Sequence, residues 1–117
     1  MKRSFLPLLA ALLAISLPAH AHDYPTSGRV EYVLECMQKH EGKYEYLYKC
    51  SCVIDHIAKQ MSYDDYVAMS TASRNQTMAG ERGALFRDPE PVKEMARKYK
   101  TLQASADKAC YVNVAQR

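Results

Sequence analysis

Residues 92–110 read VKEMARKYKTLQASADKAC and carry the strongest periodic pattern in the chain. Apolar side chains recur there every three or four residues, which is the spacing of one face of an α-helix. They are Val92, Met95, Ala96, Tyr99, Leu102, Ala106 and Cys110. Asp88 and Pro89, just before this stretch, fit the N-cap and the first residue of a helix. The sequence therefore predicts a long C-terminal helix that starts at Pro89.

Two segments nearer the N-terminus show the same spacing. One starts at Ser27 and is stopped by Gly42, and the other runs from Leu47 to Met61. The start of the second segment is ambiguous, because three tyrosines around it alternate at period two and also fit a strand. The apolar residues that follow are spaced for a helix, so we predict helices for both segments.

A further segment begins at Ser62, a good N-cap residue, and Asp65 three positions later completes a capping box. This helix is expected to end between Arg74 and Met78. The glycines of residues 80–83, Gly-Glu-Arg-Gly, then predict a loop before the C-terminal helix. Together these segments predict an all-α fold, a small bundle of about four helices.

The N-terminus has the pattern of a secretory signal peptide. Lys2 and Arg3 precede an apolar run at residues 5–17, and residues 19–21, Ala-His-Ala, place small side chains where a signal peptidase cuts. The run of about 13 residues is too short for a membrane anchor, since crossing a bilayer takes roughly 20. We predict cleavage after Ala21 and export to the periplasm or out of the cell.

Cleavage would leave residues 22–117 as one domain, with residues 22–27 as a flexible N-terminal arm. The whole chain has a formal net charge of +3, and the loss of Lys2 and Arg3 lowers it to about +1. Because this charge is so small, nucleic acid is not an expected partner.

All four cysteines, Cys36, Cys50, Cys52 and Cys110, lie in this domain. An even number in a small exported domain predicts two disulfides. A bridge between Cys50 and Cys52 would close a very tight ring and is discounted. Cys50 and Cys110 lie at the centre of apolar helix faces, whereas Cys52 points to nearly the opposite side. This geometry favours Cys50–Cys110 with Cys36–Cys52, and a Cys36–Cys50 peptide would overturn it.

The segment Cys50-Ser51-Cys52 also fits a redox dithiol or a clamp for a soft metal, with His56 one helical turn beyond Cys52. Cleavage would make His22 the N-terminal residue, which can chelate copper through its amine and ring. The structural interpretation is stronger, because thiols in an oxidising compartment are expected to be bridged. No haem-attachment motif or nucleophile motif is present, so we predict no metal, no cofactor and no enzymatic activity.

Tyrosine occurs nine times and tryptophan not at all, and tyrosine is enriched at protein interfaces. Three tyrosines gather near the start of the second helix: Tyr44, Tyr46 and Tyr48. They cannot all face one core if that segment is helical, so at least one should be exposed. The loop expected from Gly80 to Asp88 adds three residues of types that often anchor contacts: Arg82, Phe86 and Arg87. A second interpretation stays open, in which the tyrosines cap a small core and the loop only connects helices.

The exported region has the spacing C-x13-C-x-C, followed by a final cysteine in the last helix. In this it resembles small uncharacterised four-cysteine periplasmic proteins, which are associated with bacterial quinoprotein alcohol-oxidation systems. The resemblance implies an accessory role and assigns no site residues.

We therefore expect a disulfide-stapled helical protein that is exported and acts through contacts with a protein partner. A first alternative is a copper- or redox-handling protein built on Cys50, Cys52 and His56, which would show two reactive thiols where the bridged framework shows none. A second is a small helical stress chaperone of the periplasm, which would suppress aggregation of client proteins at acid pH.

Overall fold

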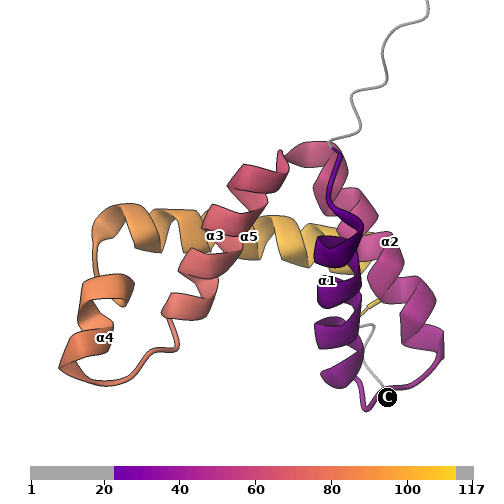
Figure 1. Cartoon of the computed structure of the whole chain (residues 1–117), viewed down its shortest axis with the longest axis horizontal. Coiled ribbons are helices and arrows are strands. Elements are labelled where there is room, and N and C mark those ends of the chain that lie inside the picture. Colours follow the sequence, from indigo (N-terminus) through magenta and orange to yellow (C-terminus); the bar gives the residue numbers. More distant parts are fainter. Residues whose placement is uncertain (1–22, 113–117) are drawn as a thin grey trace, which may run out of the picture.

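The computed structural model describes residues 23–112, which form five helices and no strand (Figure 1). They are α1 (Thr26–Gln38), α2 (Glu45–Gln60), α3 (Tyr63–Asn75), α4 (Gly80–Arg87) and α5 (Glu90–Ala109). All four cysteines are in disulfides, so the predicted all-α fold with two disulfides is confirmed. The predicted signal peptide and His22 lie outside the described residues.

Helix α5 joins two arms of the molecule (Figure 1). One arm is the hairpin of α1 and α2 at the C-terminal end of α5, and the other is α4 at its N-terminal end. Helix α3 packs along α5 between them, and α2 packs against both α1 and α5. The position of α2 between these two helices decides the disulfide pairing described below.

The core is centred on α2. Cys50, Val53, Ile54 and Ile57 are its most buried side chains, each at most 1% exposed. They follow each other at three- and four-residue spacing, so they lie on one face of the helix. The apolar periodicity that predicted this helix therefore follows its buried face.

The N-terminal segment is packed against the core. Tyr24 is only 3% exposed, and its hydroxyl donates a hydrogen bond to the backbone oxygen of Met61 over 3.1 Å. Its ring lies 5.2 Å and 5.3 Å, between centroids, from the rings of Tyr63 and Tyr66. The flexible arm predicted for residues 22–27 is thus wrong from Tyr24 onward, because Tyr24 buries its apolar ring and satisfies its hydroxyl, and α1 begins at Thr26.

Helix α3 starts where the sequence predicts. The Ser62 hydroxyl oxygen accepts a hydrogen bond from the backbone N–H of Asp65 over 3.2 Å. Asp64 and Asp65 stand in the first turn, where negative charge interacts favourably with the helix dipole. The helix ends at Asn75, inside the predicted range.

The loop predicted at residues 80–83 is wrong, because these residues form the first turn of α4. Gly80 enters this helix with a φ of +79°, a conformation that glycine adopts without strain. At Gly83 a Cβ atom would lie 3.0 Å from the Cβ of Met78, a close approach that favours a glycine there. Arg87 Nη1 donates to the backbone oxygen of Met78 over 2.6 Å and completes the turn.

Asp88 ends α4 and does not cap α5, whose N-cap is Pro89. The predicted cap is therefore wrong by one residue. The Asp88 carboxylate instead accepts a hydrogen bond from Arg87 Nε over 2.7 Å, which holds the pKa of that carboxyl below its usual value. The proline still stands at the helix entrance, where its fixed φ is tolerated.

The two disulfides join Cys36 to Cys50 and Cys52 to Cys110. The predicted pairing of Cys50 with Cys110 and of Cys36 with Cys52 is therefore wrong. Side chains two positions apart on a helix point to nearly opposite sides. Because α2 lies between its neighbours, Cys50 meets α1 and Cys52 meets the end of α5. Cys50 is buried in the core, as its place in an apolar helix face predicted. The helix that packs against this face is α1, so Cys50 pairs with Cys36 and not with Cys110.

Candidate functional site

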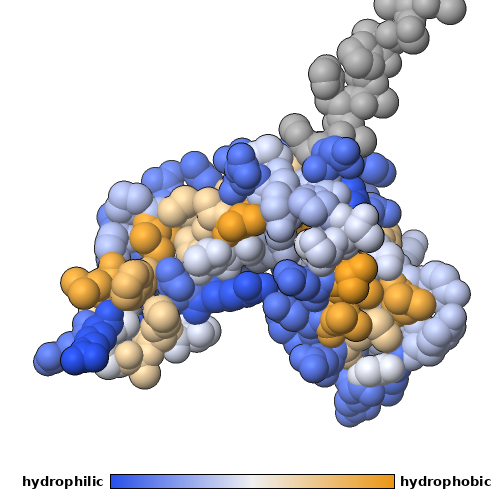
Figure 2. All heavy atoms as spheres, viewed as in Figure 1, coloured by the Kyte–Doolittle hydropathy of each residue, from blue (hydrophilic) through white to orange (hydrophobic). Residues whose placement is uncertain are grey.

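An apolar groove of about 270 Å³ runs between α1 and α2, and we call it the α1–α2 groove. Its lining residues are Arg29, Val30, Val33, Leu34, Met37, Leu47, Ser51, Ile54 and Asp55. Val33 and Ile54 belong to the buried core, so the groove opens directly onto the centre of the domain. Figure 2 shows the resulting patch of apolar surface over the α1 and α2 arm.

Two side chains of this groove project into solvent. Val30 is 49% exposed and Leu34 is 58% exposed, and they stand one helical turn apart on α1. Both residues follow the three- and four-residue spacing of the apolar face of this helix. In the structure they lie at the edge of that face, beyond the width that α2 alone can cover.

The charged residues of the lining neutralise each other. Arg29 Nη1 lies 2.6 Å from Asp55 Oδ1, which bridges α1 to α2 at the edge of the groove. The Arg29 guanidinium also lies 5.4 Å from the centroid of the Tyr24 ring. The groove therefore presents apolar surface flanked by a closed ion pair.

A second apolar surface lies on the α4 arm, at the opposite end of the molecule (Figure 2). Leu85 is 74% exposed, Phe86 56% and Met78 43%. Phe86 is one of the predicted interface residues and is accessible as expected. Leu85 was not predicted, because its neighbours were expected to form a connection and not a helix.

The predicted tyrosine cluster divides between surface and core. Tyr44 and Tyr48 are exposed, and their rings meet edge to face with centroids 5.8 Å apart. Tyr46 is 5% exposed, and its ring stacks on the His40 ring with centroids 4.0 Å apart. The Lys49 ammonium lies 4.8 Å from the centroid of the Tyr46 ring. The prediction that not all three face the core is confirmed, and Tyr46 is a structural residue.

The two predicted arginines of the α4 region differ in role. Arg87 is held by its bonds to Met78 and Asp88, so it stabilises the link between α3 and α5. Gln76 Nε2 adds to this link by donating to the backbone oxygen of Arg87 over 3.0 Å. Arg82 is exposed on α4 and stays available for a contact.

A cysteine–histidine group lies where α2 meets the C-terminal end of α5. One ligand atom each of Cys52, His56 and Cys110 lies within 4.8 Å of the other two. Cys52 and Cys110 form a disulfide, so neither sulfur is a thiolate in this state. The set predicted from the sequence included Cys50, which is instead bonded to Cys36 and lies outside the group.

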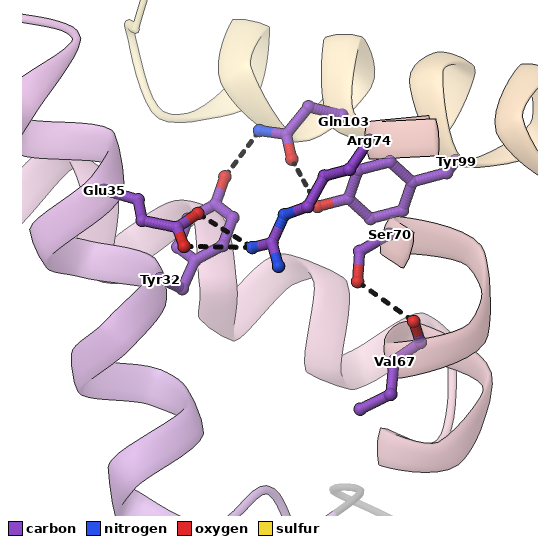
Figure 3. A network of polar contacts seen from close by, with 7 residues as sticks. All are labelled: Tyr32, Glu35, Val67, Ser70, Arg74, Tyr99 and Gln103. Carbon is purple, nitrogen blue, oxygen red and sulfur yellow. Dashed lines mark hydrogen bonds and ion pairs between the residues drawn. The ribbon is translucent and has the colours of Figure 1, made fainter. Parts of the chain in front are cut away.

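A polar cleft of about 450 Å³ lies where α1, α3 and α5 meet (Figure 3). Gln103 of α5 donates to the Tyr32 hydroxyl over 2.5 Å and accepts from the Tyr99 hydroxyl over 3.1 Å. Arg74 Nη2 lies 3.0 Å and 2.8 Å from the two carboxylate oxygens of Glu35. These bonds join three helices at one junction.

The phenols of the polar cleft are protonated at neutral pH. Burial raises the pKa of Tyr32 and of Tyr99 well above the usual 10.0. They act as neutral hydrogen-bonding groups, which suits a structural junction and not a nucleophile or a base. Sequence reasoning missed this cleft, because its residues come from three separate helices.

Among the helices within residues 23–112, none is both long and apolar enough to cross a membrane. Comparisons of the chain with protein-family models, curated proteins and solved structures gave no match. The function is therefore inferred from the surfaces and side-chain groups of the chain itself.

Proposed function

We propose that this chain is an exported interaction protein without catalytic activity, and that it binds an apolar helical segment of a partner protein in the α1–α2 groove. The observation that carries the proposal is the exposure of Val30 and Leu34 beside a buried apolar floor. Contiguous apolar surface of this kind marks interaction sites in small proteins. Covering it contributes about 25 cal/mol for each Å² removed from water.

The charge around the groove supports a neutral occupant. Arg29 and Asp55 are the charged residues of the lining, and their ion pair leaves the groove without a net charge. A charged peptide would gain little there, whereas an amphipathic helix can place apolar side chains between two helical walls. Such a helix would present anchors at three- and four-residue spacing toward Val30 and Leu34.

Export is part of the proposal. The basic start, the short apolar run and the small residues before His22 support cleavage after Ala21. Two disulfides suit an oxidising compartment such as the periplasm. The resemblance to periplasmic proteins associated with quinoprotein alcohol oxidation suggests that the partner belongs to such a system.

The test is a pull-down from the native exported fraction, with the unmodified chain and two matched surface variants as baits. Val30→Asp combined with Leu34→Asp places charge in the groove, and Val67→Asp places it on α3, where Val67 is 43% exposed outside the lining. A photo-crosslinker at position 34 identifies the partner segment that occupies the groove. We expect the double variant to weaken binding by more than about thirtyfold, as for a hot spot worth about 2 kcal/mol.

The Val67→Asp control should bind the partner as the unmodified chain does, and circular dichroism should be the same for all three proteins. Equal binding by the groove variant and the control would overturn the proposal. Sedimentation of the chain alone tests a second copy as the occupant. If the chain forms a dimer that the Leu34→Asp change dissociates, the occupant of the groove is a second copy of this chain and not a foreign partner.

A stress chaperone is a second candidate function, favoured by the apolar surface on the α4 arm. Leu85 and Phe86 there are exposed and separate from the α1–α2 groove, so an unfolded client could contact both arms at once. The candidate predicts that the chain suppresses acid-induced aggregation of an unrelated protein. Combined Leu85→Asp and Phe86→Asp changes should abolish that suppression, and no suppression by the unmodified chain would remove the candidate.

A further inference from the structure

We propose that reduction of the Cys52–Cys110 disulfide turns Cys52, His56 and Cys110 into a binding site for a soft metal ion, Zn²⁺ or Cu⁺. The inference is independent of the α1–α2 groove and of the proposed partner. Two thiolates and one imidazole are ligands that both ions prefer. While the disulfide is intact the sulfurs are bonded to each other, so the metal site belongs to the reduced chain.

Helix geometry and backbone contacts position the ligands in addition to the disulfide. Cys52 and His56 stand one turn apart on α2, so they share a face. Cys110 is 4% exposed and directly follows α5, and the next turn is closed by the Val112 N–H, which donates to the Asp107 backbone oxygen over 2.9 Å. Val112 is itself 3% exposed and anchors this turn in the core.

The size of the group fits a metal ion. Tetrahedral coordination with metal–sulfur bonds of about 2.3 Å separates ligand atoms by roughly 3.5 to 4 Å. The two sulfurs are bonded to each other in the disulfide and separate to that distance after reduction, and the His56 ligand atom already lies within 4.8 Å of both sulfurs. Cys52 and His56 are half-buried, which leaves one side open for the ion and for a further ligand such as water.

Exposure also favours reduction at this disulfide. Cys36 and Cys50 are 8% and 0% exposed, whereas Cys52 is half-buried, so the Cys52–Cys110 bridge contains the most exposed of the four cysteines. A thiolate of a dithiol reductant attacks Cys52 Sγ and releases Cys110 as a thiolate that takes up a proton. The second thiol of the reductant then displaces Cys52, so the reductant becomes a disulfide while Cys52 and Cys110 gain two electrons and two protons. Binding of the metal releases the two thiol protons.

The test uses the purified chain with both disulfides formed. Limited reduction by a dithiol, followed by its removal under anaerobic conditions, should release two thiols, and peptide mapping should assign them to Cys52 and Cys110. Separate titrations with Zn²⁺ and with Cu⁺ against chromophoric chelators then measure affinity. We expect binding of one ion per chain by at least one of the two metals, and no comparable binding by the oxidised chain.

Two histidine variants provide the matched comparison. His56→Ala should weaken metal binding by more than about tenfold. Loss of a residue that only hydrogen-bonds to a metal ligand already lowers metal affinity about ten- to hundredfold, and His56 is itself a ligand in this proposal. His40→Ala changes another half-buried histidine outside the group and should leave the affinity unchanged. The proposal is overturned if the first two thiols come from Cys36 and Cys50, if neither metal binds the reduced chain, or if His56→Ala binds as tightly as the unmodified chain.

Discussion

Cys50 and Cys52 stand two residues apart on α2, yet they form their disulfides on opposite sides of that helix. Cys50 joins Cys36 of α1, and Cys52 joins Cys110 at the end of α5. The C-x-C segment thus fastens both neighbours of α2 to it. The Cys36–Cys50 bridge links the two helices of the hairpin that carries the α1–α2 groove. The Cys52–Cys110 bridge links two helices that are far apart in the sequence.

The bridge to the end of α5 should stabilise the fold more than the hairpin bridge. Cys52 and Cys110 are 58 residues apart, and Cys36 and Cys50 are 14 apart. The loss of chain entropy in the unfolded state corresponds to about 4 kcal/mol and about 3 kcal/mol, respectively. We expect the Cys52→Ala, Cys110→Ala variant to lose about 4 kcal/mol of unfolding free energy in urea. A loss below about 1 kcal/mol would contradict the entropic account.

Gly28 is a point where the packing of α1 against α3 can be tested. A Cβ atom at Gly28 would lie 2.9 Å from Cε2 and from the hydroxyl oxygen of Tyr63, whose ring is packed against Tyr24. Replacing glycine by alanine inside a helix normally stabilises by about 1 kcal/mol. Here we expect Gly28→Ala to destabilise instead, by about 1 to 3 kcal/mol from overpacking.

Thermal or urea unfolding measures this change, and a double-mutant cycle locates its cause. In a Tyr63→Ala background the clash is removed, so Gly28→Ala should be neutral or stabilising there. If Gly28→Ala costs the same in both backgrounds, contact with Tyr63 is not the reason for the glycine.

Features set by neighbouring residues could be predicted from the sequence. The Ser62 cap depends on an N–H three residues away, and the periodic stripe of α5 depends on spacing along one helix, so both were found. Exposure of part of the tyrosine cluster followed from the same geometry. These predictions required no knowledge of which helices are neighbours.

Features that depend on the arrangement of helices could not be predicted in this way. The disulfide pairing requires knowing that α1 and α5 lie on different sides of α2. The ion pair of Arg74 with Glu35 joins positions 39 residues apart, and the glycine at position 83 is explained by its approach to Met78. The Cys52–His56–Cys110 group was missed in part for the same reason, since Cys110 reaches it from another helix.

The buried tyrosines predict a loss of stability at alkaline pH. Burial raises the pKa of Tyr24 to about 12, against 10.0 for a free phenol, and the pKa of Tyr32 and Tyr99 is raised further. A group with a higher pKa in the folded chain binds its proton more tightly there, so its contribution is complete below pH 10 and declines as the pH rises through the folded pKa.

The urea concentration at the midpoint of unfolding should therefore stay constant up to about pH 10 and fall between pH 10 and about 12. The Tyr24→Phe variant should decline less steeply over that range. At neutral pH the same variant should lose about 1 kcal/mol, because the hydrogen bond to Met61 is removed. If all tyrosines ionised near pH 10 while the helix content stayed constant, this account of their burial would be wrong.

Export can be tested through the new N-terminus together with the cysteines. Expressed with residues 1–21 in a bacterium that has a periplasm, the chain should accumulate there with His22 as its first residue and without reactive thiols. The Ala21→Arg variant places a large charged side chain where signal peptidase requires a small one, so it should remain uncleaved. Ser27→Ala, beyond the cleavage site, serves as the control and should be processed normally. Retention of the unmodified chain in the cytoplasm with free thiols would contradict export, and it would also place the chain where the reduced cysteine–histidine group could form directly.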